Sequence, residues 1–128
     1  MKIPSPDQER AAREAEARRH LADAGASDLP RAPWLHRGQP PSSVDLVRYA
    51  VWRGQSGTAT ADDVEAALTL LADARAEVEQ LETATVFLAR ADGMSWSRIA
   101  RASGLGSAQA ALQRFDRLAA RAESRRDR

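Results

Sequence analysis

The sequence predicts an all-α fold: a helical bundle in which a long acidic helix is followed by a C-terminal helix-turn-helix, with a helical arm at the N-terminus. Three observations support this prediction. Residues 60–91 contain neither glycine nor proline, and their apolar residues recur at alternating steps of three and four, as in a bundle helix or a coiled coil. Two shorter segments follow, and the turn between them contains glycine, as a helix-turn-helix requires.

Length and composition limit what the chain can be. Its 128 residues suffice for one compact domain and a modest arm. It contains no cysteine, which excludes a disulfide framework, a thiolate metal site and a cysteine nucleophile. Because no apolar run is long enough to cross a bilayer and Met1–Pro4 lead into a charged stretch, we expect a cytoplasmic protein without a signal peptide or membrane contact.

The net charge of +1 hides an uneven distribution. Residues 1–57 have 9 basic and 7 acidic side chains, whereas residues 58–92 have 2 basic and 8 acidic ones. Residues 93–128 have 8 arginines and 3 acids. An acidic middle followed by a basic end indicates two partners of different chemistry.

Residues 1–25 are expected to form a charged helical arm. Ser5 and Gln8 have the spacing of a capping box, Pro6 suits the first turn, and Gly25 ends the helix. Alanine supplies nearly all of its apolar side chains, and Leu21 is the one large apolar residue. This helix therefore has little to bury, and we expect it to be partly ordered or to order on a partner.

Residues 26–42 are predicted to be a proline-rich linker, which Trp34-Leu35 holds against the domain. Residues 43–57 are predicted to be a short helix and a loop. Ser42 and Asp45 again have capping-box spacing, although the segment that follows is also rich in residues that favour strands.

Residues 58–121 are predicted to form one domain that contains the long helix and the helix-turn-helix. Thr60 and Asp63 have the spacing of a capping box, and the helix runs to Ala91. Its apolar seam either pairs with a second copy of the chain or lies in an internal core. In the first case the expected dimer contacts are Leu71, Val78, Leu81 and Leu88. The pattern leaves open whether the helix is continuous or kinked near Glu79–Thr83.

Two capped segments form the predicted helix-turn-helix. Ser95 caps a helix over residues 96–103, and Ser107 caps a last helix over about residues 108–122. Gly104 lies between them, where the turn requires a residue that tolerates positive φ.

Small and apolar side chains are placed to pack these two helices together. Ala100 leaves room for the last helix to cross the preceding one, and Leu105 enters the core between them. Trp96 is expected in the same core, with base stacking as the alternative.

A projection of the last helix at roughly 100° per residue separates two faces. The inner face contains apolar side chains, which are Ala108, Ala111, Leu112, Phe115, Leu118 and Ala119. The outer face contains amides and guanidinium groups, whose donor geometry suits base edges and phosphates. These are Gln109, Gln113, Arg114, Arg117 and Arg121. On the preceding helix Ser97, Arg98 and Arg101 face outward, where they are expected to hold phosphates, and Ser107 is expected to donate to another.

The C-terminal segment resembles a known family of DNA-binding proteins. Residues 94–100 read MSWSRIA, and residues 105–115 read LGSAQAALQRF. They are similar to the C-terminal helix-turn-helix of small actinobacterial DNA-binding proteins, in which such a stretch follows a long acidic helix rich in alanine and leucine. The resemblance covers about residues 60–118 and implies binding to double-stranded DNA. The family often has arginine where this chain has Ala108, and Gly106 lengthens the turn by one residue.

We therefore expect a dimeric, nucleoid-associated transcriptional regulator that reads the major groove with its last helix. The predicted DNA contacts are Ser97, Arg98, Arg101, Ser107, Gln109, Gln113, Arg114, Arg117 and Arg121. One alternative is a protein-interaction module, in which the long helix and residues 1–57 bind a sigma factor or a phage or plasmid component. Another is a helical packing unit with a solvated arginine face. The basic tail, residues 122–128, either holds phosphates or frays.

The sequence does not favour an enzyme. It lacks a glycine-rich phosphate loop and a nucleophile elbow. His20 and His36 have no partners at metal-ligand spacing, so neither a metal nor a cofactor is expected.

Overall fold

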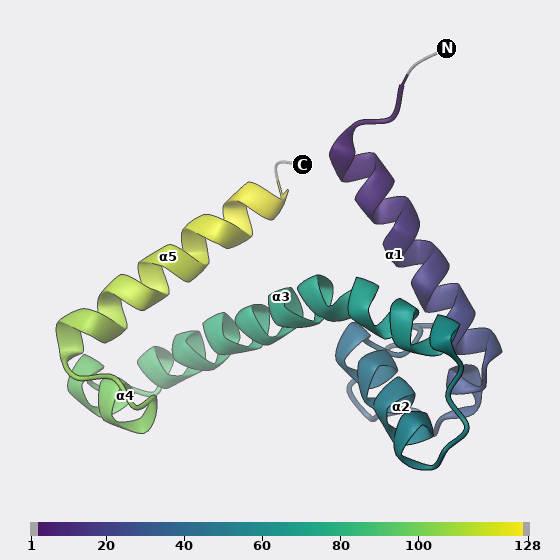
Figure 1. Cartoon of the computed structure of the whole chain (residues 1–128). Coiled ribbons are helices and arrows are strands. Elements are labelled where there is room, and N and C mark those ends of the chain that lie inside the picture. The colour runs from purple at the N-terminus through teal and green to yellow at the C-terminus, as the bar shows by residue number, and fades with distance from the viewer. Residues whose placement is uncertain (1–2, 127–128) are drawn as a thin grey trace. The chain divides into compact units, whose positions relative to one another are not determined.

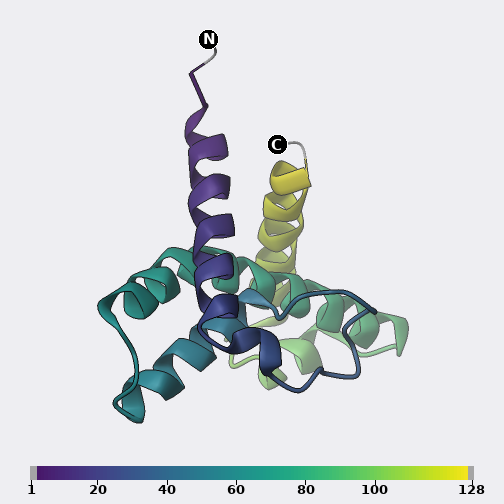
Figure 2. The same cartoon turned by 90° about the vertical axis from the view of Figure 1, so that its right-hand side faces the viewer.

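The computed structural model describes residues 3–126, within which every regular element is helical (Figures 1 and 2). The predicted all-α class is confirmed. The α-helices are α1 (Pro6–Asp23), α2 (Ser43–Gln55), α3 (Ala61–Ala91), α4 (Trp96–Ala102) and α5 (Ala108–Arg126), and Ala26–Asp28 form a short 3₁₀ helix.

The chain divides into two compact units between Arg75 and Ala76, so that α3 contributes to both. The N-terminal unit contains α1, α2 and the first part of α3. The C-terminal unit contains the rest of α3 with α4 and α5. The α3 helix runs from Ala61 to Ala91 and is not interrupted near Glu79–Thr83. The predicted arm, linker and short helix thus belong to one unit with the start of the long helix.

Side-chain caps begin α1 and α2 where the sequence predicts them. The backbone N–H of Gln8 donates to Ser5 Oγ at 3.2 Å, and the N–H of Ser5 donates back to Gln8 Oε1 at 2.9 Å. At α2 the N–H of Asp45 donates to Ser42 Oγ at 3.2 Å. The helical prediction for this segment is therefore confirmed over its strand alternative.

The second half of α1 packs into a core instead of extending as an arm. Ala17 and Leu21 are buried with Leu46 of α2 and Leu70 of α3. Leu21 is fully buried, at 0% exposure, and the alanines around it let the neighbouring helices approach closely. The expectation that this helix has little to bury was therefore wrong for its second half.

A buried carboxylate joins the three helices of the N-terminal unit. Asp63 on α3 is only 2% exposed, and it accepts from His20 Nε2 of α1 at 2.7 Å and from Arg53 Nε of α2 at 3.2 Å. It also accepts from the N–H of Thr60 at 2.9 Å, which completes the predicted capping box. This last hydrogen bond is the main reason why the pKa of Asp63 lies below its usual value.

Gly25 allows a close contact after the end of α1. Its φ is +132°, and a Cβ added there would lie 2.3 Å from Tyr49 Oη. Without that carbon, the Tyr49 hydroxyl donates to the carbonyl of Ala24 at 3.0 Å. A positive φ and the absence of a side chain are both required at this position.

The segment between α1 and α2 does not bury its tryptophan. Trp34 is 77% exposed, whereas Leu29 packs against the N-terminal core. Arg31 braces the segment, because its guanidinium donates to the carbonyls of Gln39, at 3.0 Å, and of His36. Of the predicted pair Trp34-Leu35, the tryptophan therefore does not hold the segment against the domain, whereas Leu35 is half-buried.

The C-terminal unit has a smaller core. Ile99 and Ala100 of α4 and Ala111 of α5 are buried together. Val86 of α3 is among the partly buried side chains that pack against them. Gly93, at φ +82°, ends α3 and directs the chain into α4.

Candidate nucleic-acid interface

Local capping and one glycine shape the turn between α4 and α5. Ser95 Oγ accepts from the N–H of Arg98 at 3.1 Å at the start of α4. Gly104 has φ +73°, and the N–H of Leu105 beyond it donates to the carbonyl of Ala100 at 2.8 Å. The predicted cap and the predicted positive φ are confirmed.

The two helices of this motif meet through small side chains. Ala100 is 2% exposed and Ala111 is 4% exposed, and Leu105 packs against the cluster that they form. Alanine on both helices lets their backbones approach closely. The predicted packing roles of Ala100 and Leu105 are confirmed.

Trp96 is half-buried and has neighbours on two other helices. Its ring centroid lies 5.9 Å from that of Phe115, with the planes inclined at 50°. The guanidinium of Arg90 lies 4.9 Å from the centre of the Trp96 ring. These contacts favour the core role over base stacking.

A shallow hollow of about 300 Å³ lies where α4 approaches the start of α5. Ser97, Arg101, Gly106 and Ser107 are among the residues that line it. The first N–H groups of α5 lack partners within the helix and mark the positive end of its dipole. Ser107 Oγ accepts from one of them, that of Ala110, at 3.1 Å. The hollow thus gathers hydroxyl, guanidinium and helix N–H donors, which are the groups that bind phosphate.

Five side chains predicted to contact DNA have no partner in the described part of the chain. Arg98, Arg101 and Arg117 are exposed, and their side chains form no ion pair within residues 3–126. Gln109 and Gln113 are also exposed, and their amides form no hydrogen bond within the same range. The structure therefore leaves these five side chains available to a ligand.

Two other side chains predicted to contact DNA face α3 instead. Arg114 donates two hydrogen bonds to the carboxylate of Glu82, with Nη2 2.8 Å from Oε1. Arg121 Nη1 lies 3.0 Å from Glu79 Oε1. The projection placed both arginines outward, but the buried stripe of α5 is rotated from the predicted one, so that Leu112 is 37% exposed and Arg114 turns inward. The outward orientation predicted for Arg114 is thereby corrected, whereas Arg121 remains exposed, as predicted, although it pairs with Glu79.

Two glutamates of α3 compensate part of the positive charge of α5. Glu79 also accepts from Arg125 Nη1 at 3.2 Å, so this residue of the predicted basic tail is held in place. Hydrogen bonding from Arg114 is the main cause that lowers the pKa of Glu82, and the carboxylate in turn raises the pKa of Arg114. A sequence signal for these pairs exists: two glutamates three residues apart on one helix, and arginines seven and four residues apart on the other.

Three of the four predicted dimer contacts are exposed in the C-terminal unit. Val78 is 53% exposed, Leu81 61% and Leu88 68%. Leu71, in the N-terminal unit, is partly buried. The internal-core alternative therefore does not hold for the three exposed residues, and the seam is open to another surface.

No protein-family model matches the chain, and neither a curated protein nor a solved structure matches it. Within residues 3–126, no helix combines the length and hydropathy needed to cross a membrane. In the same range, no three histidine, aspartate or glutamate side chains gather as metal ligands would.

Proposed function

We propose that the chain is a cytoplasmic, nucleoid-associated transcriptional regulator that binds double-stranded DNA through α4 and α5. The observation that carries this proposal is the set of unpaired donors on these two helices. Arg98, Arg101 and Arg117 lack acidic partners within residues 3–126, and Gln109 and Gln113 accompany them on the exposed surface. The resemblance of the motif to actinobacterial DNA-binding proteins supports the same role.

In this proposal the side chains of α5 contact the bases. Gln109, Gln113 and Arg117 of α5 enter the major groove, where glutamine pairs with adenine and arginine with guanine. Asp116 is exposed on the same helix, and its carboxylate suits the amino group of cytosine.

Phosphate contacts orient the protein on the duplex. Arg98 and Arg101 of α4 contact the backbone on one side of the groove. The hollow formed by Ser97, Arg101 and Ser107 at the start of α5 receives one phosphate. These contacts supply affinity that does not depend on the base sequence and that falls as salt rises.

A second copy of the chain completes the site. Val78, Leu81 and Leu88 are large apolar side chains that recur at steps of three and seven along α3. Their exposure supports pairing of two α3 helices, which would place two α5 helices on one duplex. Linked half-sites gain affinity because the second binding event is intramolecular.

Fluorescence anisotropy with a labelled duplex of random sequence tests the proposal. The triple variant Arg98→Ala, Arg101→Ala, Arg117→Ala should bind weakly, and the slope of log affinity against log salt should fall by about 0.9 for each phosphate that the variant no longer neutralises. The matched control is Arg13→Ala, Arg37→Ala, Arg75→Ala, which removes the same charge from exposed arginines of the N-terminal unit that form no ion pair within residues 3–126. Equal affinity of the two triple variants for the duplex would contradict DNA binding by this surface. A wild-type affinity that does not change with salt concentration would contradict it as well.

A further inference from the structure

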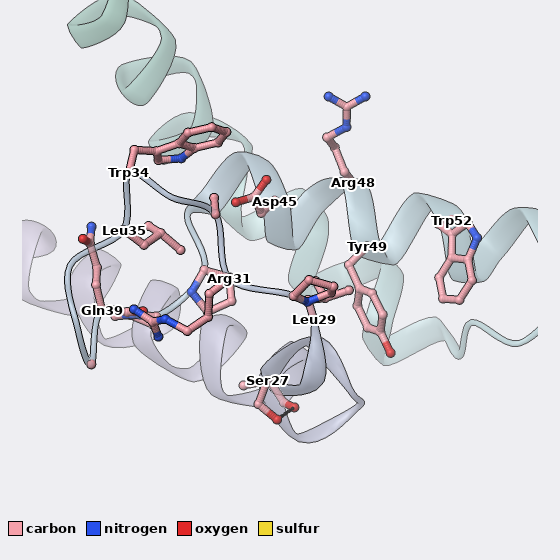
Figure 3. A pocket seen from close by; sticks show the side chains of 16 residues that line it. Ser27, Leu29, Arg31, Trp34, Leu35, Gln39, Asp45, Arg48, Tyr49 and Trp52 are labelled. Atoms are coloured by element: carbon pink, nitrogen blue, oxygen red, sulfur yellow. Dashed lines mark hydrogen bonds between the residues drawn. The ribbon is translucent and has the colours of Figure 1, made fainter.

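A groove of about 610 Å³ lies in the N-terminal unit between α2 and the segment that joins α1 to α2 (Figure 3). Asp45, Arg48, Tyr49 and Trp52 form its α2 wall, since residues at steps of three, four and seven share one helix face. Its volume lies within the range of ligand sites, roughly 300–1,000 Å³. No part of the proposed DNA interface contributes to this groove.

Two tryptophans of the groove are exposed to solvent. Trp34 is 77% exposed and Trp52 is 61% exposed, and Figure 3 shows them at opposite ends of the groove. Neither indole N–H donates a hydrogen bond within residues 3–126. Two large flat rings with free donors on one groove indicate a partner that covers the rings and also supplies acceptors.

The walls of the groove are held in place before any partner binds. The ring centroids of Tyr49 and Trp52 lie 5.9 Å apart. The Tyr49 hydroxyl is held in place because it donates to the carbonyl of Ala24. On the opposite wall, the hydrogen bonds from Arg31 to two carbonyls brace the connecting segment. A preformed groove binds without the entropic cost of ordering its own walls.

We propose that this groove binds an extended, proline-rich segment of a partner protein that carries an acidic residue. A polyproline II segment has no internal hydrogen bonds, so its carbonyls are free to accept from the indoles of Trp34 and Trp52. Prolyl rings pack on flat aromatic surfaces, and aromatic-lined grooves bind such segments in this way. An α-helix is a poorer match, because its carbonyls are already occupied within the helix.

The charge of Arg48 determines where the acidic residue of the partner segment binds. Arg48 is one of the residues that line the groove, and Figure 3 shows its side chain extending out to solvent at the rim; its guanidinium has no partner within residues 3–126. It is therefore the group that receives the carboxylate of the partner. Asp45 lies one turn earlier on the same face, so the acidic residue binds on the Trp52 side of Arg48, away from Asp45.

The test uses the full chain and a fluorescein-labelled peptide in which one glutamate is followed by alternating prolines and leucines. The peptide should bind saturably at concentrations below about 1 mM, and the same peptide with alanine in place of proline should not. Trp34→Ala and Trp52→Ala should each weaken binding by about tenfold or more. The control is Phe87→Ala, which removes an aromatic ring of similar exposure, 69%, from the C-terminal unit and should leave binding unchanged.

A charge exchange tests the position of the acidic residue. Arg48→Glu should weaken binding of the glutamate peptide and strengthen binding of a peptide with lysine in its place. Because Trp34, Arg48 and Trp52 are exposed, these variants should fold, which circular dichroism checks. Absence of binding by the proline peptide, equal binding of the alanine peptide, or tryptophan variants that bind as well as the wild type would overturn the proposal.

Discussion

Arg114 of α5 and Glu82 of α3 form a two-bond ion pair, with Arg114 Nη2 2.8 Å from Glu82 Oε1. A guanidinium that forms two parallel hydrogen bonds to a carboxylate is fixed in orientation as well as in charge. Phosphate oxygens would have to displace Glu82 before Arg114 could contact DNA. The pair therefore joins α5 to α3 at this point and takes one arginine out of the charge that α5 presents.

Removing the competing carboxylates should strengthen DNA binding. In the double variant Glu79→Gln, Glu82→Gln, Arg114, Arg121 and Arg125 lose their acidic partners and become available to phosphates. We expect roughly tenfold higher affinity at low salt and a steeper dependence on salt, measured by anisotropy with random duplex. The control is Glu65→Gln, Glu77→Gln, which removes the same charge from side chains without a partner within residues 3–126. An affinity gain of equal size in the control would mean that net charge alone is responsible.

The ion pair should make the C-terminal unit sensitive to acid. Because Arg114 holds the pKa of Glu82 below its usual value of 4.5, the pair stabilises the fold above that pH and loses this contribution as pH falls through the lowered pKa. Both partners are partly solvated, so we expect an effect of less than about 1 kcal/mol. Thermal unfolding of wild type and Glu82→Gln should differ at pH 7 and converge at lower pH. A difference in melting temperature that stays constant with pH would contradict this prediction.

Asp63→Asn should destabilise the N-terminal unit strongly. The substitution leaves Arg53 and His20 of this part-buried network without a carboxylate, and loss of the charged acceptor costs about 1–3 kcal/mol. Amide hydrogen exchange followed by residue should show faster exchange in α1, α2 and the first part of α3. The neighbouring Asp62 is exposed, and Asp62→Asn should have almost no effect. Similar protection of the amides from exchange in both variants would show that the Asp63 network contributes little to the stability of the N-terminal unit.

Gly25→Ala should cost about 2–4 kcal/mol, measured by urea unfolding. The added methyl would overlap the Tyr49 hydroxyl, and φ +132° is itself strained for alanine. Adding Tyr49→Phe should recover part of the loss, because it removes the atom that is overlapped. Gly38→Ala is the control: φ is +83° there, but a Cβ meets nothing within 4 Å, so only backbone strain is expected. Equal losses at the two glycines would mean that the Tyr49 contact has no effect.

Acidic substitutions in the seam should separate the proposed dimer. We expect Leu81→Glu, Leu88→Glu to elute from a sizing column with the mass of one chain and to bind duplex DNA roughly 100-fold more weakly. Leu68→Glu is the control, since Leu68 is 63% exposed on the N-terminal part of α3. A wild-type protein that is already monomeric when bound to DNA would remove the dimer from the proposal.

Local features of the fold were predictable because they depend on neighbouring residues alone. The caps at Ser5, Ser42 and Ser95 follow from side chains that accept from N–H groups three residues later. The positive φ of Gly104 follows from the need to reverse direction within a short turn. Such features identify helix ends without any knowledge of tertiary contacts.

Features that depend on distant contacts were not predictable. On α5 the positions of Leu112 and Arg114 were misjudged, because the ion pair with Glu82 decides where Arg114 points. The exposure of Trp34 depends on how the proline-rich segment bends back toward α2, which no local pattern encodes. The groove and the α3–α5 ion pairs therefore emerge only from the three-dimensional arrangement of the helices.

The open space around Gly106 has a practical use. A Cβ added there meets no heavy atom within 4 Å, and the backbone does not require positive φ. Since the chain contains no cysteine, Gly106→Cys would introduce a unique thiol beside the hollow at the start of α5. The fluorescence of a dye attached to that sulfur would change when a duplex binds at the turn between α4 and α5. No other site of the chain would carry the dye.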